Sequence, residues 1–313
     1  MTHIRPSRKL HGPHSHRGLG GVLVFLLAVT SACDRAPANG GGESAYDVVI
    51  ANARIVDGTG NPWYEGDVGI RGDRIVTVAP RGALTSANAK DRVDATGLVL
   101  APGFIDIQSH SWNQLLFADG RVIGKVAQGV TSEILGEATT PAPSNARVDS
   151  LFMGGDPEDA LMLARVPQYR GARGFGVWLD SMQVNVGSYL GATTVRAYAM
   201  GRREGVPSPA EQDTMRAIVA NAMRDGAFGI SSALIYPPGS YAGTDELIEN
   251  ARAMAPLHGT YITHMRSEEN QLLSAMDEAL RVGRDGGVPL VIYHFKAAGR
   301  VNWPLAVPAI AKI

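Results

Sequence analysis

Short apolar runs alternate with longer amphipathic stretches from residue 103 onward. Six of these runs have the length and composition of buried strands, at 103–107, 130–135, 195–200, 227–231, 261–263 and 289–293. Stretches between them have the period of a helix. One begins at the capping box Ser208-Pro209-Ala210-Glu211, and another begins at Ser267. This alternation predicts an α/β fold with a parallel sheet, of the TIM-like (β/α)8 barrel type.

Residues 46–100 follow a different pattern. Three β-rich runs, beginning at Tyr46, Asp67 and Asp94, are separated by turn residues. We therefore expect a small β layer before the barrel. A (β/α)8 barrel needs eight strands. Because only six candidates precede Ile313, we expect the barrel to be truncated after about six strands.

The first 45 residues have the pattern of a targeting segment. Basic residues are followed by the apolar core 21–29, which is shorter than the roughly 20 residues of a membrane-spanning helix. Ser31 and Ala32 then precede Cys33, as in a bacterial lipobox. We predict a lipoprotein-type signal peptide over 1–33, a lipid anchor at Cys33 and a flexible linker over 34–45. The alternative is an ordinary secretory signal with an incidental cysteine.

A lipid anchor at Cys33 implies that the protein is exported and held in the bacterial cell envelope, in the periplasm or at the surface. Membrane fractionation of a Cys33→Ser variant tests it, because loss of the lipid should release the protein. Cys33 is the only cysteine among 313 residues, which excludes an intrachain disulfide. The formal net charge of −1 offers no electrostatic argument for binding nucleic acid.

Polar residues end several of the predicted barrel strands, where the active site of such a barrel lies. They are Gln108 and His110, Glu137, His264, and His294. Imidazoles with a carboxylate suit Zn²⁺, which can activate water for hydrolysis. For His110 a hydrogen-bonded packing role is an equal alternative, and Glu137 could instead cap the segment that follows it.

Five segments, taken in order, resemble one known family. They are APGFIDIQSHS, QGVTSEILGE, SSALIYPPGSYA, THMRSE and HFKAAGR. Together they resemble the N-acyl-D-amino-acid deacylase (D-aminoacylase) branch of the metal-dependent amidohydrolase superfamily, from about Tyr46 to the last residue. The resemblance implies a barrel over 101–313 and a small β-sandwich portion over 46–100. It also implies zinc-dependent hydrolysis of the amide bond of N-acyl-D-amino acids.

The resemblance implies a role for each matching residue. Glu137, His264 and His294 match the ligands of a tightly held zinc, with Glu137 where some relatives have cysteine. Gln108 and His110 match a His-x-His pair that helps to hold a second, weaker metal. Because an amide is a poor ligand for zinc, Gln108 predicts an essentially mononuclear centre with only a weak second site at His110.

Two further residues match positions near the substrate. Tyr236 is suited to polarise a carbonyl, and Lys296 is suited to bind a carboxylate. The alternatives are packing of Tyr236 against Pro237-Pro238 and a solvated loop charge at Lys296. The general-base aspartate of the family is expected beyond Ile313. We therefore expect the 313-residue chain by itself to be an inactive fragment.

Two other functions stay open. A cyclic-amide hydrolase of the dihydroorotase or hydantoinase type shares the early motif, but it usually needs a complete His-x-His pair and a carboxylated lysine. The second alternative is a non-catalytic surface lipoprotein that keeps the barrel as a binding scaffold. Metal content and turnover of an N-acyl-D-amino acid distinguish all three.

Overall fold

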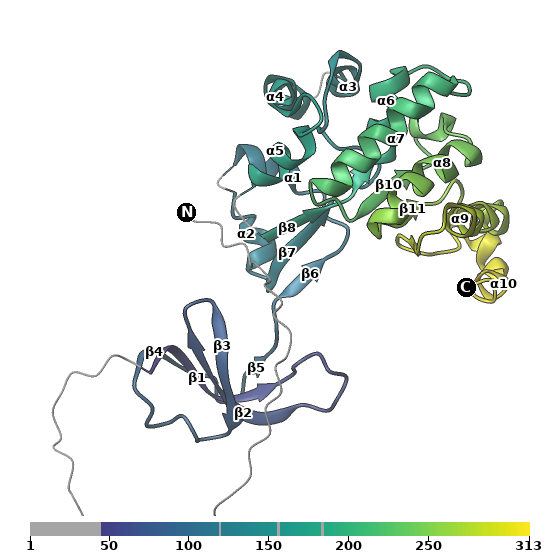
Figure 1. Ribbon diagram of the computed structural model, residues 1–313. Helices are drawn as coiled ribbons and strands as arrows, with labels where there is room; N and C mark the ends of the chain where they lie inside the picture. The colour runs from purple at the N-terminus through teal and green to yellow at the C-terminus, as the bar shows by residue number, and fades with distance from the viewer. Residues whose placement is uncertain (1–44, 119, 155–156, 183–184) are drawn as a thin grey trace, which may run out of the picture. The chain divides into compact units, whose positions relative to one another are not determined.

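The computed structural model describes residues 45–118, 120–154, 157–182 and 185–313 (Figure 1). The predicted signal peptide with Cys33, and nearly all of the predicted linker, lie outside these residues. The described residues divide into two compact units, one of residues 45–52 with 66–94 and one of those within 53–65 and 95–313. In the described part of the chain, no helix combines the length and apolar character that crossing a bilayer requires.

The early strands form one five-stranded sheet. Its members are β1 (Tyr46–Ile55), β2 (Tyr64–Arg71), β3 (Arg74–Pro80), β4 (Ala89–Asp94) and β5 (Val99–Leu100). The order is β3-β2-β1-β4, and β5 pairs with the end of β1. Alternate residues of β1 are buried, so Val49 and Ala51 pack with Leu84 beneath the sheet. The predicted β layer is confirmed. In the described residues it consists of this single sheet.

Parallel strands follow from residue 104. They are β6 (Phe104–Asp106), β7 (Val130–Leu135), β8 (Asn185–Ser188), β9 (Leu190–Gly191), β10 (Gly229–Ala233), β11 (Thr260–His264) and β12 (Leu290–Ile292). They form the sheets β6-β7-β8 and β9-β10-β11-β12. Only Tyr189 separates β8 from β9, so the two sheets follow each other along the chain. The predicted α/β architecture is confirmed by these parallel pairs.

Helices connect the strands and cover them. They are α1 (Trp112–Phe117), α2 (Ile123–Val126), α3 (Ala146–Asp149), α4 (Pro157–Arg165), α5 (Gly174–Asp180), α6 (Ala192–Met200), α7 (Pro209–Arg224), α8 (Thr244–Met254), α9 (Leu272–Gly286) and α10 (Ala306–Ile310). Short 3-10 turns are η1 (Ser150–Phe152), η2 (Val166–Tyr169), η3 (Gly239–Tyr241), η4 (Ala255–Leu257) and η5 (Arg300–Leu305). Helices α6, α7, α8 and α9 each pack on the next (Figure 1).

The predicted start of α7 is confirmed and that of α9 is wrong. Ser208 accepts a hydrogen bond from the backbone of Glu211, whose side chain bonds back to Ser208. Helix α9 begins at Leu272 rather than at Ser267. In the loop before α9, the Glu268 side chain points inward and contacts His294. This tertiary contact keeps the residues around Glu268 out of the helix.

The strand predicted at 195–200 is also wrong. These residues form the carboxyl-terminal part of α6. The strands in this part of the chain are β8 and β9, which come just before α6. Every residue of α6 except Tyr198 is buried. A helix that is buried on all sides has no polar face, so its apolar run cannot be told from that of a buried strand.

Candidate metal centre

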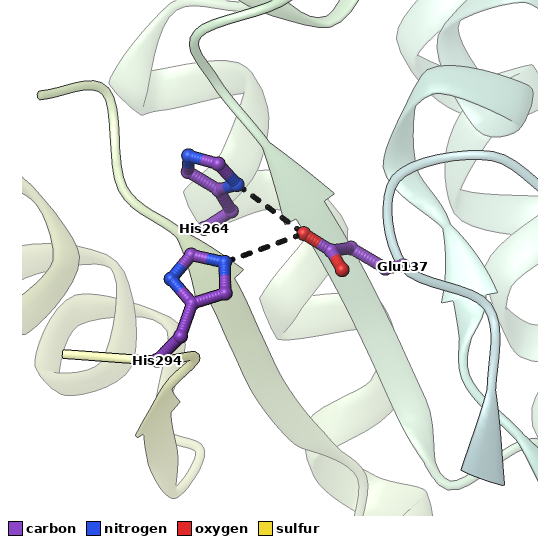
Figure 2. A group of neighbouring side chains, drawn as sticks. All are labelled: Glu137, His264 and His294. Atoms are coloured by element: carbon purple, nitrogen blue, oxygen red, sulfur yellow. Dashed lines mark hydrogen bonds and ion pairs between the residues drawn. The ribbon is translucent and has the colours of Figure 1, made fainter. Parts of the chain in front are cut away.

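Three side chains from the carboxyl ends of separate strands meet at one point (Figure 2). Glu137 follows β7 by two residues, His264 is the last residue of β11, and His294 follows β12 by two residues. Each of the three offers one ligand atom, and these atoms lie within 4.8 Å of one another. In a parallel α/β array, the carboxyl ends of the strands are where ligands bind.

Gly136 sets the direction of the backbone between the end of β7 and Glu137. Its φ is +100°, and a Cβ at this position would lie 2.1 Å from the backbone oxygen of Tyr189. Only glycine fits both the backbone conformation and the close approach. The turn at Gly136 therefore directs the Glu137 carboxylate across the ends of the strands toward the two histidines.

The spacing of the ligand atoms fits a small tetrahedral metal ion. Glu137 Oε1 lies 3.2 Å from His264 Nδ1 and 3.7 Å from His294 Nε2. Two ligands of one tetrahedral zinc lie about 3.3 Å apart, given bonds of about 2.0 Å. The imidazole rings stand almost perpendicular, at 88°, with their centroids 4.5 Å apart (Figure 2). One carboxylate and two imidazoles form a donor set typical of catalytic zinc.

The other oxygen of Glu137 is occupied by protein donors. Gln108 Nε2 donates to Glu137 Oε2 at 2.6 Å, and His110 Nε2 lies 3.0 Å from the same atom. Burial acts to raise the pKa of the Glu137 carboxyl, but hydrogen bonds from His110 and Gln108 outweigh it and lower the pKa to about 2. Gln108 thus presents its amide nitrogen, and not the amide oxygen that a metal would need.

Lys125 holds the strand end that carries Gln108 and His110. Its Nζ lies 2.7 Å from both Asp106 Oδ2 and Ser109 Oγ, and 2.8 Å from Glu133 Oε2. Burial would lower the pKa of Lys125, but hydrogen bonds to Asp106 and Glu133 outweigh it and raise the pKa. This partly buried network ties the end of β6 to β7, which fixes the segment that faces Glu137.

The predicted substrate residues lie beside the same group. The Tyr236 ring stands edge-on to the His264 ring with centroids 5.6 Å apart, and Tyr236 is 60% exposed. Lys296 forms an ion pair with Glu268, and its Nζ is 3.1 Å from His294 Nδ1. Lys296 is therefore not a freely solvated loop charge.

Glu268 was missed by reasoning from the sequence. It is buried, and its Oε1 lies 2.7 Å from His294 Nδ1. The available signal was an acidic residue four positions after His264, in the loop that follows β11. That spacing does not indicate a contact with His294 unless the loop is already known to approach the end of β12.

The chain is similar in sequence to curated D-aminoacylases and related deacylases. A D-aminoacylase of Alcaligenes xylosoxydans xylosoxydans is 36% identical over 273 residues, which are 82% of this chain and 52% of that protein. The chain is a homologue of the D-aminoacylases. This confirms the family resemblance seen in the motifs, although no protein-family model matches the chain.

Solved structures of the D-aminoacylase group share the fold. A D-aminoacylase studied for the functional role of its binuclear metal centre gives a TM-score of 0.73 at 33% identity. An N-acyl-D-glutamate deacylase from Bordetella bronchiseptica, complexed with zinc and a phosphonate inhibitor, gives 0.74 at 30% identity. Both comparisons cover 86% of this chain and 55% of the other chain. The chain spans about half the length of the curated relatives that it matches.

Proposed function

We propose that the protein hydrolyses the amide bond of N-acyl-D-amino acids with one zinc ion held by Glu137, His264 and His294. The observation that carries this proposal is the convergence of these three ligand groups at spacings that suit zinc. The zinc in the N-acyl-D-glutamate deacylase structure supports the choice of metal. Zinc supplies Lewis acidity, which polarises an amide carbonyl and makes water a better nucleophile.

The protein groups around this point have separate roles in the proposal. Glu137 is the anionic ligand, because its low pKa keeps it ionised across the neutral range. Tyr236 is exposed beside His264, where its hydroxyl can donate to the substrate carbonyl. Lys296 supplies the positive charge for the substrate carboxylate, for which Glu268 competes.

We also propose that the parallel array belongs to a (β/α)8 barrel and that β1 to β5 belong to a small β-sandwich. The consecutive parallel strands with helices packed on them support the first part, as do ligand groups gathered at the carboxyl ends. A crystal structure of the full-length protein tests both parts. An open sheet in that structure would exclude the barrel.

The activity is tested on the full-length protein loaded with one equivalent of zinc. N-acetyl-D-methionine, N-acetyl-D-aspartate and N-acetyl-D-glutamate are compared with their L enantiomers, and the released amino acid is measured. We expect hydrolysis of the D compounds and its loss on chelation. Tight zinc binding without any turnover would favour the binding scaffold, and turnover of dihydroorotate or hydantoin instead would favour the cyclic-amide hydrolase.

Gln108 gives a prediction about the number of metal ions. Changing Gln108→His rebuilds a His-x-His pair with His110 and removes the amide donor from Glu137 Oε2. His110, which also lies 3.0 Å from that oxygen, would then join it and the new histidine in binding a second ion, so we expect the zinc content to rise from one toward two ions per chain. Elemental analysis after gel filtration measures it. Gln128→His, at an exposed glutamine, is the control and should leave one ion. Two tight ions in the unmodified protein would contradict the mononuclear proposal.

A further inference from the structure

Glu268 lies between the candidate metal ligands and the candidate substrate lysine. Its backbone oxygen accepts a hydrogen bond from Ala298 at 2.7 Å, which holds the loop after β11 against the loop after β12. Its Oε1 is 2.7 Å from His294 Nδ1, and its Oε2 forms the ion pair with Lys296. Its Oε2 is also 4.0 Å from His264 Nε2. One buried carboxylate therefore contacts two residues of the candidate site directly.

Two groups compete for the same ring atom of His294. Glu268 Oε1 and Lys296 Nζ lie 2.7 and 3.1 Å from His294 Nδ1. An ionised carboxylate can only accept a hydrogen bond, and an ammonium can only donate one. Nδ1 must therefore carry a proton to bond with Glu268, and it must lack one to bond with Lys296.

Which of these two groups bonds to Nδ1 decides whether Nε2 of His294 can bind a metal. A neutral imidazole carries one ring proton. With that proton on Nδ1, the lone pair of Nε2 faces Glu137 Oε1, 3.7 Å away. With Lys296 donating to Nδ1, the proton sits on Nε2 and blocks the ligand position. Carboxylates that accept from a ligating histidine are known to fix its tautomer in this way.

We propose that Glu268 is a positioning residue that keeps His294 in its metal-binding tautomer by drawing the Lys296 ammonium to its own second oxygen. Glu268 accepts from Nδ1–H through Oε1 and pairs with Lys296 through Oε2, so the lysine does not donate to the ring. The effect on metal affinity rests on the proposed zinc centre, whereas the tautomer itself can be measured without a metal.

The first test measures zinc affinity by competition with a chromophoric chelator. Glu268→Gln keeps the shape but loses the charge that holds Lys296, so we expect zinc binding to weaken roughly 10- to 100-fold. Glu269→Gln is the matched control at the adjacent exposed residue, and it should bind as the unmodified chain does. Equal affinities for the two variants would overturn the proposal.

The second test removes Lys296, the group that competes with Glu268 for His294 Nδ1. In Glu268→Gln/Lys296→Met, the amide oxygen of the glutamine can accept from Nδ1–H without a rival donor. We expect the double variant to regain at least about tenfold of the lost affinity. Lys296→Met by itself measures the gain that comes from removing a positive charge near the metal, and a merely structural role of Glu268 predicts no recovery beyond that gain. A double variant that recovers no more than that gain would therefore overturn the proposal.

The third test separates this proposal from the zinc centre. Long-range ¹H–¹⁵N NMR spectra of the metal-free chain report which ring nitrogen of His294 carries the proton. We expect Nδ1–H in the unmodified chain and a shift toward Nε2–H in Glu268→Gln. Failure of the unmodified chain to bind zinc would refute the proposed metal centre, while an Nε2–H ring in the unmodified chain would refute the role of Glu268.

Discussion

Replacing His264 or His294 by asparagine is expected to weaken zinc binding by roughly 100- to 1,000-fold. A tight zinc site of four ligands is worth about 10–16 kcal/mol, so each ligand accounts for roughly 2.5–4 kcal/mol, and 1.4 kcal/mol is a tenfold change. Asparagine is chosen because His294 has a φ of +32°, and asparagine tolerates positive φ better than other non-glycine residues. Competition with a chromophoric chelator measures the affinity.

His258→Asn is the matched control for these variants. His258 also has a positive φ, of 59°, and is exposed. It lies in the turn between α8 and β11 and takes no part in the group at the strand ends. We expect its zinc affinity to stay within about twofold of the unmodified chain. Unchanged binding in both His264→Asn and His294→Asn would show that the metal is held elsewhere.

Replacing Glu246 by glutamine is expected to lower the free energy of unfolding by about 3–5 kcal/mol. Arg196 of α6 is completely buried and forms an ion pair with Glu246 of α8, which is also buried. Two further hydrogen bonds join Arg196 Nη2 to the backbone oxygens of Arg203 and Gly205, at 3.1 and 2.8 Å. Burial raises the pKa of the Glu246 carboxyl to about 7, although Arg196 acts to lower it, so unfolding is measured at pH 8, where removing the carboxylate leaves a buried guanidinium without a compensating charge. Urea unfolding followed by circular dichroism measures the change.

The adjacent residue provides the control for this prediction. Asp245 forms an ion pair with Arg281 at the surface, where its side chain is 86% exposed. Because solvent screens exposed pairs, we expect Asp245→Asn to change the free energy of unfolding by no more than about 1 kcal/mol. If Glu246→Gln and Asp245→Asn had the same small effect, the buried pair would not contribute to stability in the way described.

Local patterns in the sequence were enough to predict much of the fold. The run 130–135 is strand β7 with the predicted bounds, and the capping box at Ser208 starts α7. Both follow from interactions between residues close in sequence, namely alternating burial and the bonding of a helix terminus. The same reasoning placed Glu137, His264 and His294 at the ends of strands, since a polar residue after an apolar run marks the point where a strand leaves the core.

Contacts between distant residues were decided only by the tertiary structure. Helix α6 was mistaken for a strand because its burial comes from α7, β10 and other elements around it, which its own nine residues do not specify. The orientation of the Gln108 amide depends on Glu137, 29 residues away. The sequence by itself determined which residues reach the carboxyl ends of the strands. The pairing of Glu268 with His294, 26 residues apart, was decided by the paths of two loops, because hydrophobic periodicity encodes burial and not the partner of a buried charge.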